Sequence, residues 1–157
     1  MTEPTIAQEP LTSPDARALV ALLDAELTER YPNPADNHLT LAVDEVSEGR
    51  GVFLVARAGD HPVGCGAMRR IDRTTGEIKR MYVAPPERGR GLGARLLAEL
   101  ERHARALGLR RLVLETGERQ PESIRLYEKS GFTRIACFGE YLETPASVCM
   151  GKELAGD

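Results

Sequence analysis

The sequence predicts an α+β or mixed α/β fold, in which helices lie on the faces of one sheet. Short apolar runs bounded by glycine, proline and threonine turns are typical of strands, and longer runs with apolar residues at helical spacing are typical of helices. In chain order they give a strand, a helix, three strands, a helix, a strand, a helix and two strands. The length of 157 residues indicates a single domain, residues 1–157.

The N-terminal half is predicted to hold an edge strand, a helix and an antiparallel meander. Residues 5–11 form the edge strand. Ser13 is a candidate N-cap before a proline and an acid, so a helix should begin there and end at Tyr31, which precedes a proline. The polar segment 33–51 has room for one short helix. The meander strands are predicted at residues 51–58, 62–71 and 77–83.

The C-terminal half is predicted to alternate helices and strands. Leucines and alanines after residue 91 recur at helical spacing, and Gly108 should end that helix. A strand at residues 112–115 follows, and then a helix from Pro121 to about Ser130. The last two strands are predicted at residues 132–138 and 147–152.

Charge, hydropathy and cysteine content exclude several classes of function. A net charge of −3 argues against nucleic-acid binding, which needs clustered Lys and Arg. No apolar run approaches the roughly 18 to 20 residues of a membrane span, so we expect a soluble protein without a membrane partner. The cysteine usage and an N-terminus unlike a signal peptide predict a cytoplasmic location. Cys65, Cys137 and Cys149 are odd in number and lack CxxC spacing, so we expect three small buried residues, without a disulfide framework or a metal site.

The glycine-rich stretch RGRGLG, residues 88–93, is the strongest functional signal. Its glycines let backbone amides approach an anion, and the helix that follows adds the positive end of its dipole. A phosphate group would be stabilised there, although a tight connection without a ligand explains the glycines equally well.

Two known phosphate loops fit this stretch poorly. A Walker A loop needs Gly-Lys-Ser or Gly-Lys-Thr at its end, which is missing. A dinucleotide fingerprint is matched by Gly89, Gly91 and Ala94, with Glu115 roughly 20 residues further on. Residues 84–88 separate the strand from the first glycine, however, and the chain has no room for a second nucleotide-binding half.

Two blocks of the sequence resemble the GNAT family of acetyl-CoA-dependent N-acetyltransferases. EIKRMYVAPPERGRGLGARLLAELERHARALG is similar to that family's fourth strand, pyrophosphate loop and third helix, with Arg88-x-x-Gly91-x-Gly93 matching its Arg/Gln-x-x-Gly-x-Gly/Ala signature. SIRLYEKSGF is similar to its later helix, with the family's Tyr and Gly-Phe ending. The resemblance covers about a third of the chain. It implies a mixed, mostly antiparallel sheet of about six to seven strands and direct acetyl transfer from acetyl-CoA to a primary amine.

The resemblance implies that acetyl-CoA is held by the loop and by the strand before it. Backbone amides of residues 88–94 would hold the pyrophosphate, and the backbone of residues 81–83 would pair with the pantetheine amides. Gln120 keeps a side-chain amide where the family commonly has Asn, seven residues before Tyr127. The implied cofactor-binding residues are Met81, Tyr82, Val83, Arg88, Gly89, Arg90, Gly91, Leu92, Gly93, Ala94 and Gln120.

Direct transfer needs a neutral amine, a stabilised oxyanion and a proton for the departing thiolate. An alkyl ammonium has a pKa of about 10.4, so a base must take its proton. Glu77 matches a position where some family members carry a glutamate base, acting directly or through water; its alternative is an exposed residue that begins a strand. Tyr127 matches the family tyrosine that protonates the thiolate; its alternative is core packing. The backbone amide of Tyr82 would stabilise the oxyanion.

The acceptor is predicted as a small-molecule amine, without residue-level assignments. Tyr31, Arg70, Arg80 and Tyr141 lie near the expected pocket edges, and an arginine pair would suit a carboxylate on the acceptor as well as it suits surface salt bridges. A protein or peptide acetyltransferase and a CoA-sensing module without catalysis are the alternatives. A homodimer is compatible with the family, although the sequence holds no interface signature.

Overall fold

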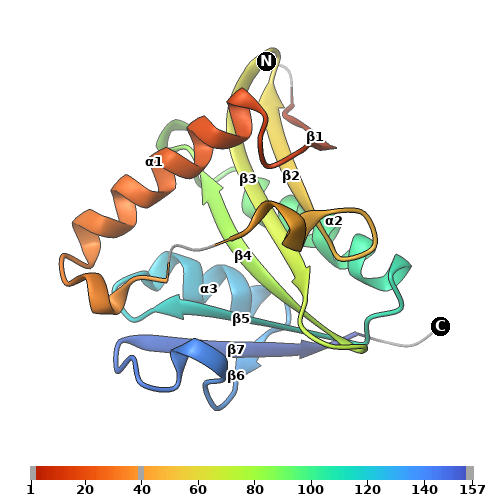
Figure 1. Cartoon of the computed structure of the whole chain (residues 1–157). Helices are drawn as coiled ribbons and strands as arrows, with labels where there is room; N and C mark the ends of the chain where they lie inside the picture. The colour runs from red at the N-terminus through yellow and green to blue at the C-terminus, as the bar shows by residue number, and fades with distance from the viewer. Residues whose placement is uncertain (1–2, 39–40, 155–157) are drawn as a thin grey trace.

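A seven-stranded sheet with helices on both faces forms the framework of the protein (Figure 1). The computed structural model describes residues 3–38 and 41–154. The strands are β1 (Thr5–Gln8), β2 (Gly51–Ala58), β3 (His61–Arg70), β4 (Thr75–Val83), β5 (Arg111–Gly117), β6 (Thr133–Arg134) and β7 (Ser147–Glu153). The helices are α1 (Pro14–Arg30), α2 (Leu92–Ala106) and α3 (Pro121–Lys129), with short 3-10 helices η1 (Pro34–Asp36), η2 (Val43–Val46), η3 (Pro85–Glu87) and η4 (Gly139–Tyr141).

The sheet is mixed and mostly antiparallel, as predicted. Its strand order is β1-β2-β3-β4-β5-β7-β6, and β4 with β5 is its parallel pair. These two strands pair only from Thr75 to Ile78 on the β4 side, and beyond Ile78 they diverge (Figure 1). The facing backbone edges of β4 and β5 are therefore unpaired over their C-terminal halves, which opens a gap in the middle of the sheet.

The helices form where local signals predict them. The hydroxyl of Ser13 accepts a hydrogen bond from the backbone N–H of Ala16 at 3.1 Å, which caps α1. The apolar stripe of α1 packs on one face of β2, β3 and β4, whereas α2 and α3 pack on the other face. Gly108 has a φ of 80°, a left-handed conformation that glycine adopts without strain, and α2 ends just before it.

A β-bulge interrupts β4 at the edge of the gap. Lys79 pairs with Ala67 and Tyr82 pairs with Cys65, so two residues of β4 face the single residue Gly66 of β3. Arg80 in the bulge has a φ of 58°, and its carbonyl oxygen accepts a hydrogen bond from the thiol of Cys65 at 3.3 Å. The bulge lets the consecutive residues Lys79 and Arg80 both face the side of the sheet that α1 covers.

Three predicted elements differ from the structure. The edge strand ends at Gln8 rather than at residue 11, and the segment 33–51 holds two 3-10 helices rather than one helix. The strand predicted at residues 132–138 is only Thr133–Arg134, although the Ile135 N–H still donates to the Cys149 carbonyl at 3.0 Å. The chain then leaves β7, because Gly139 with its φ of 54° turns it into η4.

The prediction that no disulfide forms was wrong, although Cys149 is buried as expected. Cys137 and Cys149 form a disulfide with a Cα–Cα distance of 5.1 Å, because the segment after β6 runs back along β7 and brings them together. Cys65 is a free, fully buried thiol, as predicted. None of the described helices combines the length and the apolar character that crossing a membrane requires.

Candidate active site

Two cavities meet at the gap between β4 and β5. The larger one, of about 480 Å³, lies between the end of β4, the start of α2 and α3. The smaller one, of about 80 Å³, lies between β4, β5, α1 and η4. Both are lined by Leu23, Met81, Gln120, Ser123 and Tyr127. Groups held in the two cavities would therefore meet at this shared wall.

The start of α2, in the wall of the larger cavity, has an open backbone that suits an anion. Gly89 and Gly91 have φ values of 81° and 84°, and a Cβ on either would have no atom within 4 Å, so the backbone lies open there. Gly91 is also the N-cap of α2, which therefore starts without a side-chain cap for its first N–H groups. Uncapped N–H groups at the positive end of a helix are the donors that an anion needs.

All predicted cofactor residues except Arg90 line this larger cavity. The side chain of Arg88 holds the loop in place: its Nε donates to the Val83 carbonyl at 2.8 Å and its Nη2 to Glu26 at 2.6 Å. Gly93 has a packing reason for its size, because a Cβ there would come within 2.9 Å of Leu126 on α3. The loop thus separates into two open glycines, an anchoring arginine and a glycine that lets α2 approach α3.

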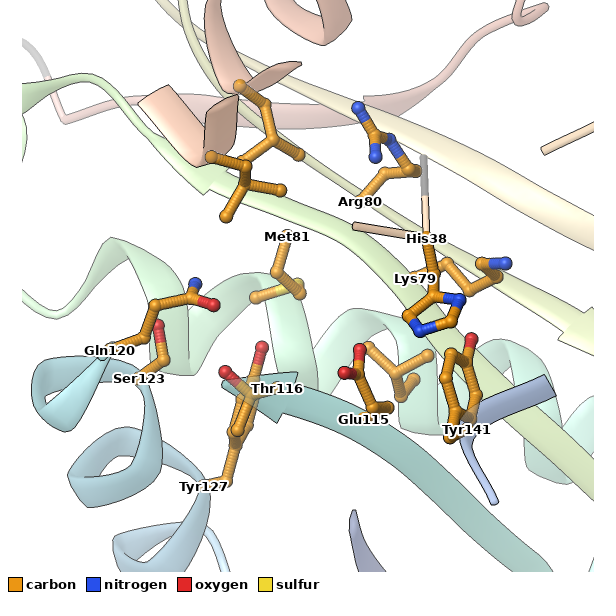
Figure 2. A pocket seen from close by; sticks show the side chains of 13 residues that line it. His38, Lys79, Arg80, Met81, Glu115, Thr116, Gln120, Ser123, Tyr127 and Tyr141 are labelled. Atoms are coloured by element: carbon orange, nitrogen blue, oxygen red, sulfur yellow. The ribbon is translucent and has the colours of Figure 1, made fainter. Parts of the chain in front are cut away.

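Tyr127 both packs in the core and lines the two cavities, and its role as the acid stays a prediction. Its ring is 6% exposed and packs edge-on against Phe132 at 6.0 Å. Its hydroxyl forms no hydrogen bond to another described residue, and the residue lines both cavities (Figure 2). Burial raises the pKa of Tyr127, and the negative charge of Glu115 adds to this, so the hydroxyl stays protonated at neutral pH.

Glu77 is buried rather than exposed, which excludes the alternative that it merely begins a strand at the surface. Its Oε1 accepts a hydrogen bond from the Arg69 Nε at 2.9 Å, and its Oε2 accepts one from the Tyr141 hydroxyl. Tyr141 lines the smaller cavity, whereas Glu77 is not among the residues that line it. The role of Glu77 as a base stays a prediction, and Tyr141 lies on its path to the cavity.

Glu115 is a candidate functional residue to which the sequence analysis gave no part in acetyl transfer. It comes from β5 and lines the smaller cavity, where Figure 2 shows its carboxylate beside Tyr141 and His38. One carboxylate oxygen accepts a hydrogen bond from the Ser147 hydroxyl at 2.7 Å. Burial raises the pKa of Glu115 to about 7, so the carboxylate can gain or lose a proton near neutral pH. An acid that directly follows the apolar run LVL of a buried strand was the available signal.

The residues expected at the pocket edges divide into two groups. Arg80 and Tyr141 line the smaller cavity, as do His38 and Thr116, which the sequence analysis did not single out. Tyr31 instead packs over Gly117, where its hydroxyl accepts the Arg119 N–H at 2.9 Å, and Arg70 donates to the carbonyls of Arg73 and Leu107. Nowhere in residues 3–38 and 41–154 do three His, Cys, Asp or Glu side chains form a group that could hold a metal ion.

Comparisons with known proteins agree with the fold. Residues 16–132 match the model of the acetyltransferase (GNAT) family. The IAA acetyltransferase of Azospirillum brasilense is 42% identical over 160 residues, which cover 98% of this chain and 100% of that protein. A crystal structure from Klebsiella pneumoniae subsp. pneumoniae, assigned to the acyl-CoA N-acyltransferases, is 35% identical with a TM-score of 0.81 and covers 97% of this chain and 98% of its own.

A GNAT family acetyltransferase from Elizabethkingia anophelis was solved with acetyl-CoA bound and has a TM-score of 0.70. It is 22% identical and covers 98% of this chain and 100% of its own, so the likeness shows a shared fold.

Proposed function

The chain belongs to the GNAT family of acetyltransferases, and from that premise we propose that it transfers the acetyl group of acetyl-CoA directly to a primary amine on a small molecule. The observation that carries the proposal is the wall shared by the two cavities, in which Tyr127 lines both. The smaller cavity has a volume of about 80 Å³, which favours a small-molecule amine over a side chain attached to a folded substrate protein. The similarity to the IAA acetyltransferase of Azospirillum brasilense supports the same choice.

The larger cavity is proposed to hold acetyl-CoA. The backbone N–H groups of residues 89–94 and the start of α2 would bind its pyrophosphate. The unpaired edge of β4 after Ile78 offers backbone groups to the amides of the pantetheine arm. The backbone amide of Tyr82, just past the bulge, would stabilise the oxyanion.

In the reaction, a C–N bond forms to the acetyl carbon and the C–S bond of the thioester breaks. Glu115 would first take a proton from the acceptor ammonium, since it lines the smaller cavity and titrates near neutral pH. Tyr127 would donate its hydroxyl proton to the leaving thiolate. The second proton of the amine then restores the tyrosine, and Glu115 releases its own to solvent.

Glu77 remains the second candidate for the base. Its carboxylate accepts hydrogen bonds from Arg69 and from Tyr141, and because Tyr141 lines the smaller cavity, its hydroxyl offers a proton route from the cavity to Glu77. A cytoplasmic location and a homodimer likewise stay predictions.

The proposal is tested by two measurements on the full chain. Calorimetry should show saturable binding of acetyl-CoA, and a thiol reagent should show release of CoA with at least one member of an amine panel that includes short peptides. Binding without release for any acceptor would indicate a CoA-sensing module. Release with peptides alone would indicate a peptide acetyltransferase.

A further inference from the structure

Arg80 stands in the wall between the smaller cavity and a third cavity. The third cavity, of about 270 Å³, is lined by Leu11, Arg17, Val20, Ala21, Asp24, Leu41 and Arg80. Most of these side chains are apolar. The positive φ of Arg80, 58°, is unfavourable for a residue with a side chain, and such conformations persist where the surroundings hold them, often at functional sites.

The charge of Arg80 is only partly paired. The residue is 7% exposed, and one of its terminal nitrogens donates to Asp24, whose own side chain is 37% exposed. A guanidinium has five N–H donors, so a single carboxylate oxygen leaves capacity for a second anion. Burial lowers the pKa of Arg80 to about 10, and the group is therefore still charged at neutral pH.

The opposite wall of the smaller cavity carries the complementary groups. Glu115 presents its carboxylate there, and the Thr116 hydroxyl beside it is buried without a hydrogen-bond partner among the described residues. Figure 2 shows Arg80 on β4 and these two residues on β5 at opposite sides of the cavity. A buried hydroxyl without a partner is unfavourable unless a ligand or water satisfies it.

We propose that the acceptor is an amino acid with a free α-amine and a free α-carboxylate. Its ammonium lies at Glu115 and Thr116, and its carboxylate pairs with Arg80. The third cavity beyond Arg80 receives an apolar side chain between Leu11, Val20 and Leu41. This inference rests on the acetyl transfer proposed above and narrows its acceptor.

The experiment compares leucine, methionine and phenylalanine with their C-terminal amides as acceptors, scored by CoA release. The amides keep the shape and the amine but lose the negative charge. For the unmodified enzyme we expect kcat/KM to be roughly 10- to 100-fold higher for the acids, the factor that one charge-assisted contact provides. Arg80→Gln should abolish this preference, and Arg80→Lys should keep part of it. Arg102→Gln, on the exposed face of α2, should leave it unchanged.

Equal or better rates with the amides would overturn the inference while leaving acetyl transfer intact. If no acceptor releases CoA, acetyl transfer fails, and calorimetric binding of the amino acids to the CoA-loaded protein still decides the amino-acid site. Binding at least tenfold weaker in Arg80→Gln supports it, and no binding refutes it. If circular dichroism shows that Arg80→Gln does not fold, the comparison of acids and amides with the unmodified enzyme and Arg80→Lys decides.

Discussion

In the proposed reaction, single residues at the gap carry out the proton transfers. Glu77 is a buried acid and Glu115 a partly buried one on neighbouring strands, and Glu115 lines the smaller cavity whereas Glu77 lines neither of the two cavities at the gap. The carboxylate of Glu77 accepts hydrogen bonds from Arg69 and Tyr141. We therefore expect a substitution of Glu77 to affect mainly the position of Tyr141 rather than a proton transfer.

The two glutamates can be separated by pH profiles. A base must be ionised to accept a proton, so kcat/KM should fall as the pH drops below about 7, the pKa to which burial raises Glu115. Glu115→Gln should lower kcat by roughly 10²- to 10⁴-fold and remove this step, with little change in acetyl-CoA affinity. Glu77→Gln should keep the step. The opposite pattern in the two profiles would make Glu77 the base.

Tyr127 is tested by removing only its hydroxyl. Tyr127→Phe keeps the ring contact with Phe132 and should therefore fold, but it cannot protonate the thiolate. We expect kcat to drop by roughly 10²-fold or more, with acetyl-CoA affinity nearly unchanged, as measured by steady-state kinetics and calorimetry. An unchanged turnover would exclude Tyr127 as the acid.

Among the elements, the loop before α2 is the one whose function, binding of a pyrophosphate, is predicted from its local sequence alone. Gly91→Val adds a side chain at a φ of 84° and places it in open space beside the larger cavity. We expect acetyl-CoA binding to weaken by more than about tenfold, because the side chain would stand between the amides and the pyrophosphate.

Gly49→Val is the matched control, since Gly49 has nearly the same φ, 82°, and equally open surroundings outside the walls of the larger cavity. It should carry the same backbone strain and bind acetyl-CoA normally. Equal loss of affinity in both variants would mean that Gly91 serves only the turn.

The elements also show how far the sequence could predict this fold. The helices were predictable because their caps and apolar spacing are local signals, as at Ser13 and Gly108. The bulge at Arg80 was not, since it depends on the register of β3 opposite β4. The proposed pyrophosphate loop, residues 88–94, is likewise one continuous motif. Glu115 and Thr116 reach the smaller cavity only through the pairing of β5 with β4 and β7, which no local pattern contains.

At the scale of the whole molecule, the disulfide between Cys137 and Cys149 can be tested by counting reactive thiols. The unfolded, unreduced protein should show one thiol, that of Cys65, and three after reduction. In the native state Cys65 should react slowly, because burial raises its pKa to about 12 and little thiolate is present. Three thiols before reduction would contradict the disulfide between Cys137 and Cys149. They would suit the cytoplasmic location predicted from the sequence, where disulfides are rare.

The gap between β4 and β5 has a consequence for how related enzymes could diverge. Arg88, Gly91 and Gly93 of the loop before α2 line the larger cavity but not the smaller one. Leu27 of α1, His38 and Tyr141 of η4 line the smaller cavity but not the larger one. Substitutions at Leu27, His38 or Tyr141 can therefore alter the choice of amine in the proposed reaction without changing the loop that would bind acetyl-CoA. Because the two cavities at the gap have partly separate linings, the acceptor-binding residues can change while the proposed pyrophosphate loop stays the same.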